Sequence, residues 1–424
     1  MADHPSPHAD ADAGACRLCG AGLKHTLVDL GKSPLCETFL SARQLDEMEP
    51  FFPLHVLVCD RCWLVQLKEY VAPDGIFTAH YPYYSSFSSS WVAHAKHYCE
   101  MISARQGLNP DSFVVELACN DGYLLQHFPP LGVANILGVE PSANVAEEAA
   151  RKGIPVRIEF FGVDEAERIR AEKGQADLIL GNNVLAHVPD INDFVGGAAR
   201  LLKPDGVITF EFPHLEKLIE FNQYDTIYHE HFSYLSATAI DALARRHGMA
   251  FVDVEELTTH GGSLRVYLAH RGEPSHAVRA LLRREEQKGF KTLAYYEGFE
   301  DKVRASKRRL LRFLIDAKDA GKTVCGYGAP GKGNTLLNYC GIGPDLLTFT
   351  VDRNPHKHGR YTPGTHIPIL PVEAIDRAKP DYILILPWNL EAEIVAQMAH
   401  VREWGAKFVV PIPEAKIIEP GAVS

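Results

Sequence analysis

The chain has 424 residues, 46% of them hydrophobic, and a formal net charge of −11. This length predicts two or three domains with well-formed cores. Because no block of Lys and Arg interrupts the acidic balance, the composition excludes nucleic acid as a main partner. The longest apolar runs, such as residues 382–386, are far shorter than the roughly 20 residues of a membrane span. We therefore expect a cytoplasmic protein that is not held in a membrane.

Two Cys-x-x-Cys pairs follow a tail, residues 1–15, that has no apolar periodicity and is predicted to be disordered. The pairs are Cys16 with Cys19 and Cys59 with Cys62. Four thiolates suit a tetrahedral zinc ion with no open position, and nine cysteines in a chain this long favour metal ligands over disulfides. Residues 16–75 are therefore predicted to form a small module stapled by structural zinc. Four reduced core cysteines are the alternative.

A strand, a tight loop and the start of a helix are predicted over residues 112–125. The apolar run 113–117 is typical of a buried strand, Cys-Asn-Asp-Gly interrupts it, and Tyr123 opens a helix-like pattern. Open α/β sheets bind ligands at the carboxyl ends of their strands, where loop N–H groups are uncovered. A second strand, residues 135–140, ends in an acid of the type that takes ribose hydroxyls. A ligand with polar ends is expected here, although a plain buried turn fits the loop alone equally well.

The next segments continue the same sheet. Residues 176–187 read as a strand that ends in two Asn and a His, and residues 201–210 read as a helix end, a turn and a strand. Residues 251–255 and 263–268 read as an antiparallel hairpin with a Gly-rich turn. Together these elements predict a Rossmann-like domain, assigned to residues 76–272.

Two polar segments inside this domain are candidates for substrate chemistry. Residues 81–91, Tyr-Pro-Tyr-Tyr-Ser-Ser-Phe-Ser-Ser-Ser-Trp, supply stacking faces and hydrogen-bond donors for a sugar or a nucleotide, or form a linker with aromatics buried against the sheet. Residues 224–234 hold Tyr228, His229, Glu230 and His231 within four positions. Proton chemistry is favoured there, because the ordinary pKa of His lies near the working pH. A metal site and a plain surface turn are the alternatives.

A charged helical connector, residues 273–318, leads to a second α/β unit, residues 319–424. Residues 322–337 again read as strand, Gly-rich loop and helix, and residues 347–352 form a strand that ends in Asp. Residues 382–388 and 407–411 continue a small parallel sheet. The spacing Gly-x-Gly-x-x-Gly at 326–331 matches a dinucleotide fingerprint, which is a frequent false positive.

The motifs taken together resemble one family. They are CRLCG, CDRCW, YPYYSSFSSSW, ELACNDGYLL, NNVLAHV, YDTIYHEHFSYLS, HGGSLRVY, GYGAPGKGNTLLNYCGI and VDRNPHKHGRYTPGTHIPI. With them the chain resembles the sugar C-methyltransferases that methylate C-3 of TDP-4-keto-deoxysugars in antibiotic and branched-sugar pathways. The resemblance implies an α/β protein with an N-terminal zinc module, a central class I methyltransferase domain and a C-terminal Rossmann-like domain that helps to hold the nucleotide sugar.

The resemblance also implies roles for individual residues. It assigns S-adenosylmethionine to Glu116, Cys119, Asn120, Gly122, Tyr123, Leu124, Glu140, Pro141, Asn182 and Asn183. It assigns the nucleotide sugar to Tyr83, Phe87, Ser88, Trp91, Tyr327, Gly328, Ala329, Lys332, Asn334, Asp352, Arg353 and Lys357, with the Gly-rich loop as a phosphate cradle. It makes His231 the general base, with Tyr228, Glu230 and His187 around the ketosugar. A monomer is expected.

Removal of a C-3 proton beside a C-4 ketone needs a base of near-neutral pKa and donors for the C-4 oxygen. His231 is expected to take the proton, Tyr228 or His187 to donate to the oxyanion, and Glu230 to orient a neighbour. The rival hypotheses are methylation of a sugar oxygen or amine, a non-catalytic protein that binds sugar nucleotides, and an oxidoreductase that uses the Gly326 loop.

Overall fold

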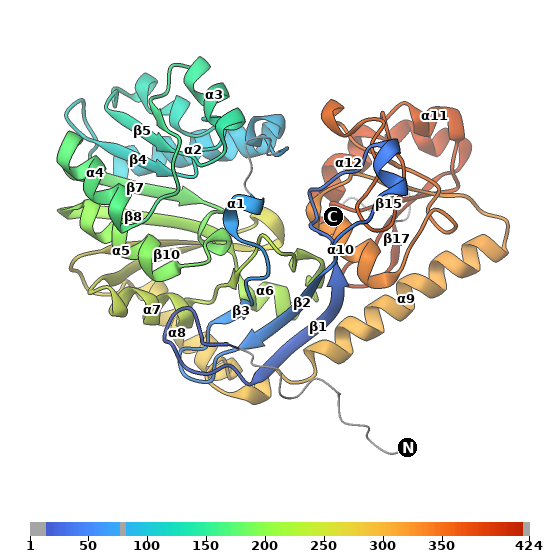
Figure 1. Ribbon diagram of the computed structural model, residues 1–424, viewed down its shortest axis with the longest axis horizontal. Coiled ribbons are helices and arrows are strands. Elements are labelled where there is room, and N and C mark those ends of the chain that lie inside the picture. The colour runs from blue at the N-terminus through green and yellow to red at the C-terminus, as the bar shows by residue number, and fades with distance from the viewer. Residues whose placement is uncertain (1–13, 77–81, 419–424) are drawn as a thin grey trace.

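The computed structural model describes residues 14–76 and 82–418, whose strands form three sheets (Figure 1). All but the last two residues of the predicted tail 1–15 lie outside the described residues. Within the described part, no helix combines the length and the apolar character that crossing a membrane requires. None of the nine cysteines forms a disulfide.

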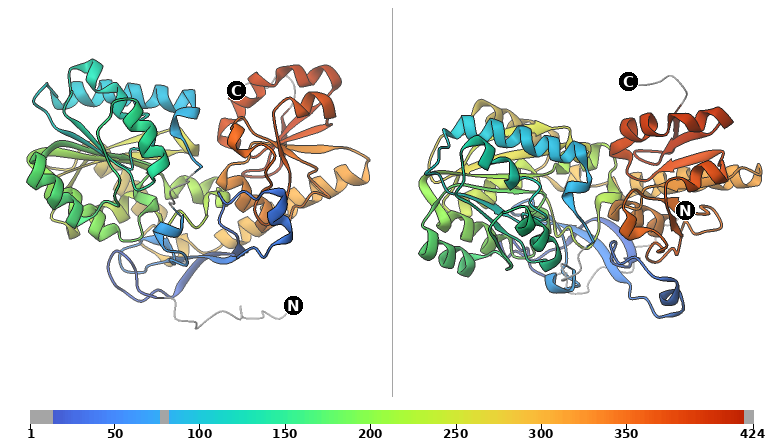
Figure 2. Two further views of the ribbon diagram at one scale, coloured as in Figure 1. Left: turned by 45° about the horizontal axis from the view of Figure 1, so that its top comes forward. Right: turned by 90° about the horizontal axis from the view of Figure 1, so that it is seen from above.

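The first sheet has the order β1-β2-β3-β9 and is antiparallel. Its strands are β1 (His25–Ser33), β2 (Phe52–Val58), β3 (Val65–Leu67) and β9 (Ser233–Tyr234). The fourth strand comes from the polar segment 224–234, so this segment is attached directly to the N-terminal module. At the other end of the module, the loop between β1 and β2 carries the short helix η1 (Ala42–Asp46) and pairs with the C-terminal half through Leu40 and Tyr361. Figure 2 shows this blue hairpin running from the central body to the orange C-terminal body.

The central sheet has seven strands in the order β10-β11-β8-β7-β4-β5-β6. They are β4 (Val114–Leu117), β5 (Ile136–Val139), β6 (Val156–Arg157), β7 (Ala176–Asn182), β8 (Leu202–Pro213), β10 (Ala250–Leu257) and β11 (Ser263–Ala269). The neighbouring strands β8, β7, β4, β5 and β6 are parallel to one another. Strands β10 and β11 form the predicted antiparallel hairpin at the edge. The predicted class I methyltransferase sheet is therefore confirmed.

Helices cover both faces of this sheet. They are α2 (Ser89–Gln106), α3 (Ala143–Arg151), α4 (Val163–Lys173), α5 (Ile191–Leu201) and α7 (Ala237–Arg246). The shorter α6 (Leu215–Glu220) packs instead in the core shared with the N-terminal sheet, and α1 is Pro73–Ile76. Alternate residues of β4 point to opposite faces: Val114 packs in the core that contains α2, and Val115 packs in the core that contains α4 and α5. Both faces of the strand are buried, which explains why apolar residues occupy successive positions, with Glu116 as the exception.

The helix expected to begin at Tyr123 does not form. The chain makes turns there, followed by two short 3-10 helices, η3 (Leu125–His127) and η4 (Pro129–Leu131). Pro129 and Pro130 lack N–H donors and cannot continue an α-helix that begins a few residues earlier. The apolar residues after Gly122 are buried in the core with α2 instead of lining one face of a helix.

The C-terminal half starts with α8 (His276–Lys288) and the long α9 (Phe299–Asp319) and continues into the third sheet. The sheet has the order β14-β13-β12-β15-β16-β17 and is parallel except for β17. Its strands are β12 (Val324–Tyr327), β13 (Thr350–Val351), β14 (Ile369–Leu370), β15 (Tyr382–Ile385), β16 (Lys407–Val410) and β17 (Lys416–Ile418). Its helices are α10 (Gly331–Cys340), α11 (Ala374–Ala378) and α12 (Glu391–Gln397).

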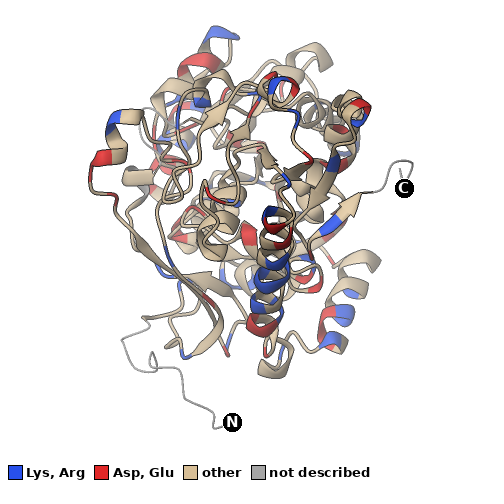
Figure 3. Cartoon of the chain, turned by 90° about the vertical axis from the view of Figure 1, so that its right-hand side faces the viewer, with Lys and Arg blue, Asp and Glu red and all other residues tan. Residues whose placement is uncertain are grey.

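Charged residues of both signs are mixed over the face shown in Figure 3. In α9, Arg304 pairs with Glu300 at 2.7 Å, and Arg309 pairs with Glu414 at 3.2 Å. The charges of the predicted connector thus form a solvated face with local ion pairs, each of small energetic value.

Replacement of Gly122 by Ala should destabilise the loop after β4. Gly122 has φ +74°, and a Cβ there would lie 2.3 Å from Ile154 Cδ1. Backbone strain and overpacking should together lower the free energy of unfolding by about 3 kcal/mol. Gly132→Ala is the matched control, because Gly132 has φ +86° and no atom within 4 Å of such a Cβ, so only about 1 kcal/mol of strain is expected. Equal losses for the two variants in urea denaturation would contradict this packing.

Candidate functional site

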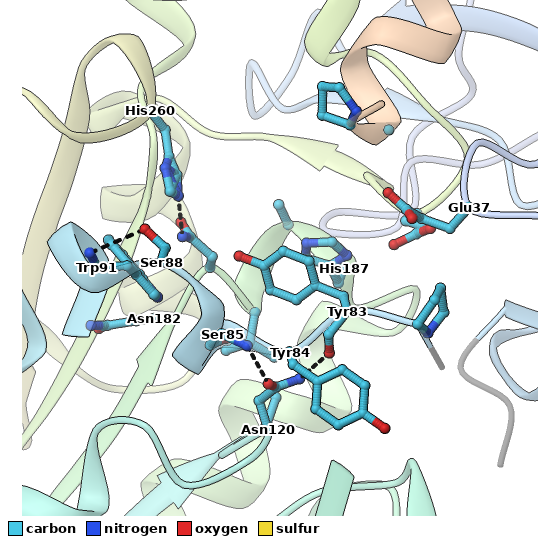
Figure 4. A pocket seen from close by; sticks show the side chains of 18 of the residues that line it. Glu37, Tyr83, Tyr84, Ser85, Ser88, Trp91, Asn120, Asn182, His187 and His260 are labelled. Carbon is cyan, nitrogen blue, oxygen red and sulfur yellow. Dashed lines mark hydrogen bonds between the residues drawn. The ribbon is translucent and has the colours of Figure 1, made fainter. Parts of the chain in front are cut away.

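A cavity of about 1230 Å³ lies between the carboxyl edge of the central sheet and the C-terminal sheet. Its walls come from all three parts of the chain, because the N-terminal module contributes Glu37. Figure 4 shows Asn120 near Tyr83 and Ser85, with His260 and Trp91 to one side and Glu37 on the opposite side. The cavity therefore has a wall from the methyltransferase domain and a wall from the C-terminal half.

The loop after β4 is fixed by an acid at the end of the neighbouring strand. Glu140, which follows β5, accepts hydrogen bonds from the backbone N–H of Asn120 at 3.0 Å and of Ser142 at 2.9 Å. Burial raises the pKa of Glu140 to about 7, and these two N–H groups oppose the shift. Asn120 has φ 50° at this tight turn, a conformation that Asn tolerates better than most residues. A carboxylate and a strained loop are thus held at the carboxyl edge of the sheet.

Six of the ten residues predicted to bind the cofactor line the cavity: Asn120, Tyr123, Glu140, Pro141, Asn182 and Asn183. The others, Glu116, Cys119, Gly122 and Leu124, do not line the cavity. Both amide atoms of Asn182 are buried without a hydrogen-bond partner in the described structure. An amide in this state needs a polar ligand, so the residues present fit a cofactor with polar groups at this end.

The segment that contains the predicted aromatic residues crosses this loop. The backbone N–H of Ser85 donates to Asn120 Oδ1 at 2.9 Å, and Asn120 Nδ2 donates to the carbonyl of Tyr83 at 3.1 Å (Figure 4). Trp91 stacks between His94 and His260, with ring centroids 5.0 and 4.9 Å away. Tyr83, Phe87, Ser88 and Trp91 all line the cavity, whereas Tyr81 of the same motif lies outside the described residues.

The turn after η6 (Tyr224–Thr226) brings Tyr228, Glu230 and His231 to the cavity wall, where they meet His187, the fourth predicted catalytic residue, from the short helix at residues 185–187. The carbonyl of Thr226 lies 2.8 Å from His231 Nδ1. A carbonyl can only accept, so Nδ1 carries the proton and the lone pair of the neutral ring is on Nε2. Burial lowers the pKa of His231 well below its usual value, and the neighbouring His187 lowers it further. His231 is therefore a neutral imidazole that can accept a proton.

Three further groups surround this imidazole. The ring centroids of Tyr228 and His187 lie 3.9 and 4.6 Å from that of His231. Burial raises the pKa of Tyr228 well above its usual value, so its O–H keeps the proton, and burial lowers the pKa of His187 to about 4. Glu230 Oε1 is 3.6 Å from Cys36 Sγ of the N-terminal module. The set combines a proton acceptor with a phenol donor.

His229 points away from this set. Its Nε2 donates to the carbonyls of Phe52 and Pro53 in β2, at 3.3 and 3.2 Å. Because His229 and His231 are held by carbonyls of different segments, they do not converge on one ion. The geometry gives no support to the alternative of a metal site in this segment.

On the C-terminal wall, the Gly-rich loop already has carboxylate partners. Asp352 Oδ2 accepts from the N–H of Ala329 at 2.7 Å, and Lys357 Nζ donates to the carbonyl of Ala329 at 2.8 Å and lies 3.5 Å from Glu37. Of the predicted sugar-nucleotide residues in this half, those that line the cavity are Tyr327, Gly328, Lys332, Asp352, Arg353 and Lys357. Ala329 and Asn334 are not in that set; Asn334 Nδ2 donates to the carbonyl of Cys36 at 2.6 Å. The N–H of Ala329 is thus already paired, and Lys357 is buried among its own partners.

Several residues that line the cavity were not predicted from the sequence, and two of them are His260 and Glu37. His260 lies in the turn between β10 and β11, where Asn183 Nδ2 donates to its Nε2 at 2.8 Å. The Gly-Gly that follows His260 signalled the turn, but nothing local indicated that the turn faces Asn183. Glu37 reaches the cavity from the N-terminal module, and no pattern in the sequence indicates this.

The four cysteines of the N-terminal module form one cluster. Their Sγ atoms all lie within 4.8 Å of one another, with Cys16 to Cys62 and Cys19 to Cys59 both at 3.5 Å. Gln66 Nε2 donates to Cys16 Sγ at 3.1 Å, a bond that helps to hold a thiolate ligand. The set has no place for a fifth ligand and fits closed, tetrahedral zinc. No cysteine is among the described residues that line the cavity, so this site is structural.

Replacement of Cys62 by Ser should abolish zinc binding and destabilise the protein. Structural zinc contributes directly to folding, so we expect metal analysis to fall from one zinc per chain to near zero, with a loss of several kcal/mol of stability. Cys36→Ser is the matched control, because Cys36 is a buried thiol of the same module outside the cluster. Zinc retained by the Cys62 variant would contradict the assignment.

Replacement of His260 by Asn should make the stability less sensitive to acid. Burial lowers the pKa of His260 to about 4, below the value of about 6.5 in the unfolded chain. The unfolded chain therefore binds more protons between these values, and the stability contribution is lost as the pH falls through this window. Between pH 7 and pH 5 the wild type should lose about 1–2 kcal/mol more free energy of unfolding than the variant. If the free energy of unfolding falls equally with pH in the two proteins, the predicted role of His260 is contradicted.

Comparisons with known proteins bear on this geometry. Residues 16–77 match a family model described as "Putative zinc binding domain", residues 91–254 match "Methyltransferase domain", and residues 258–413 match "C-methyltransferase C-terminal domain". The solved PH0226 protein from Pyrococcus horikoshii OT3 aligns with 48% of this chain and 100% of its own, at 15% identity and a TM-score of 0.36.

Two curated relatives are similar over different lengths. A ubiquinone biosynthesis O-methyltransferase of Rhodopseudomonas palustris is 30% identical over 99 residues, which are 22% of this chain and 37% of the relative. The C-methyltransferase NovU of Streptomyces niveus is 38% identical over 411 residues, which are 95% of this chain and 96% of NovU. The chain therefore belongs to the C-methyltransferase family and is an S-adenosylmethionine-dependent enzyme with a structural zinc module.

Proposed function

We propose that the enzyme methylates C-3 of a nucleotide-linked 4-keto-deoxysugar, with a TDP sugar as the preferred substrate, through an enolate. The observation that carries the proposal is the neutral imidazole of His231 beside the protonated phenol of Tyr228, in the same cavity as Asn120 and Glu140. A carbon nucleophile requires a base and an oxyanion donor, whereas methylation of an existing heteroatom nucleophile does not require the second group.

Charge and shape of the C-terminal wall support a nucleotide sugar. Lys332, Arg353 and Lys357 line the cavity and can neutralise a diphosphate. The ring centroids of Tyr84 and Phe87 lie 6.1 and 6.3 Å from that of His356. Apolar rings of this type bind the faces of a base or a sugar. We infer that the nucleotide lies along this wall and that the sugar extends toward His231.

The reaction is assigned to these groups as follows. His231 Nε2 takes the C-3 proton, the C–H electron pair moves into the enolate, and the Tyr228 O–H donates to the developing charge on the C-4 oxygen. His187 and Glu230 keep the sugar and the ring of His231 in position. When bound at the Asn120 and Glu140 end, S-adenosylmethionine supplies an electrophilic methyl group for attack by the sugar carbon. The remaining contribution of the protein is to hold the two reactants in line.

Replacement of His231 by Asn should lower kcat for methyl transfer by about 10²–10⁴-fold, because the variant lacks a proton acceptor. Transfer of a labelled methyl group should be measured over a panel of TDP-, CDP- and GDP-4-keto sugars, with the methylated position read by NMR. His229→Asn is the matched control, because the side chain of His229 is hydrogen-bonded to the backbone of β2 and does not line the cavity. Full turnover in the His231 variant, or a methyl group on oxygen or nitrogen, would refute the proposal.

A further inference from the structure

The turn that carries the proposed base is held by the C-terminal half. Thr335 Oγ1 in α10 donates to the carbonyl of Ile227 at 3.0 Å, and the Tyr224 hydroxyl lies 3.6 Å from Cys340 Sγ. The β9 strand that follows the turn pairs with β3 of the N-terminal module. The turn therefore has anchors outside the central domain to which it belongs in sequence, in addition to its bonds within that domain.

Asp225 makes a further contact of this kind, with an indole of the C-terminal half. Its side chain is fully buried, and its Oδ2 accepts from Trp388 Nε1 at 2.6 Å. Trp388 begins the 3-10 helix η10 (Trp388–Leu390) after β15. The charge of Lys332 and the hydrogen bond from Trp388, both from the C-terminal half, offset the desolvation of this buried carboxylate. The position of the Asp225 backbone therefore depends on where the C-terminal half places this indole.

The contact lies directly beside the group that orients His231. Asp225 and Thr226 are consecutive in η6, and the Thr226 carbonyl fixes the proton on His231 Nδ1. A shift of Asp225 would move that carbonyl and turn the imidazole.

A lysine and a turn complete the surroundings of the indole. Lys332 Nζ lies 4.8 Å from the centroid of the Trp388 ring and donates to Asn389 Oδ1 at 2.7 Å. A Cβ at Gly261, next to His260, would lie 2.5 Å from Trp388 Cη2, so this turn packs directly on the ring. The indole thus touches the base-bearing turn, the His260 turn and the cation of α10.

We propose that Asp225 is a positioning residue for the base: the hydrogen bond from Trp388 fixes the η6 turn, whose Thr226 carbonyl orients His231. The C-terminal half then determines the geometry of proton transfer as well as the wall of the nucleotide site. This inference rests on the proposed function, because it requires His231 to be the base.

Two variants separate the geometry of this contact from its charge. Trp388→Phe keeps the ring and removes the N–H donor, and Asp225→Asn keeps an acceptor for the indole and removes the negative charge. In Trp388→Phe, kcat should fall by about tenfold to a hundredfold, with little change in KM for the nucleotide sugar, because a small misplacement of a base affects the chemical step. In the profile of kcat against pH, the pH at which kcat falls on the acid side should stay unchanged in this variant.

In Asp225→Asn, the acid limb of the kcat profile should move to lower pH. Tyr228 and Tyr234 of its own segment lie against His231, with ring centroids 3.9 and 6.4 Å away. The groups that lower its pKa are His187 from η5 (Leu185–His187), His260 from η7 (Thr259–Gly261) and Lys332 from α10. Removal of the Asp225 carboxylate leaves the charge of Lys332 without compensation, which lowers the pKa of His231 further. A purely structural role for Asp225 would leave this limb in place.

Trp404→Phe is the matched control. Its indole Nε1 donates to the carbonyl of Pro380 at 3.2 Å in the same half of the chain, and Trp404 does not line the cavity. Normal kcat in this control with reduced kcat in Trp388→Phe supports the inference. Unchanged kcat in Trp388→Phe, or a change in KM or melting temperature alone, overturns it. If His231→Asn keeps its turnover, the proposed function fails; if that variant is inactive while Trp388→Phe is normal, only the positioning inference fails.

Discussion

The hydrogen bond from His231 Nδ1 to the Thr226 carbonyl is the constraint on which the proposed chemistry depends. It fixes the tautomer, so the lone pair is on Nε2, and burial keeps the ring neutral. Without this carbonyl the imidazole could rotate or present an N–H group, and the nearby phenol of Tyr228 would have no partner for enolate formation. The turn that supplies the carbonyl is short and irregular, so its geometry comes from its neighbours.

Those neighbours belong to all three parts of the chain. The N-terminal module binds the central domain near its cysteine cluster, where Asn192 Nδ2 donates to the carbonyl of Arg17 at 2.7 Å. Its hairpin loop pairs with the C-terminal half at Leu40 and Tyr361, with N···O distances of 3.0 and 2.9 Å. The four cysteines do not line the cavity, yet the module that they hold together connects both of its walls. This arrangement gives a physical reason for a structural metal in a methyltransferase.

The sequence predicted features that depend on local patterns. The longer strands of both α/β units, the edge hairpin and the clustering of the four cysteines follow from apolar runs and spacing, and the structure confirms them. The short strands β6, β14 and β17 were not predicted. The prediction of a helix after Gly122 was wrong, because two prolines a few residues later cannot continue a helix. Glu37, Asp225 and His260 were missed because their partners lie far away in sequence; Asp225, for example, is 163 residues from Trp388. Rules based on the spacing of residues in the sequence do not predict such contacts.

The most direct test of carbon methylation by proton removal uses a nucleotide 4-keto sugar that carries deuterium at C-3. Turnover by the wild-type enzyme should release one deuteron to water for each methyl group transferred, and NMR should show C-3 bonded to the new methyl carbon. Retention of the deuterium at C-3 of the methylated product would contradict the account, because the methyl group would then have gone to an atom that needs no proton removed from carbon.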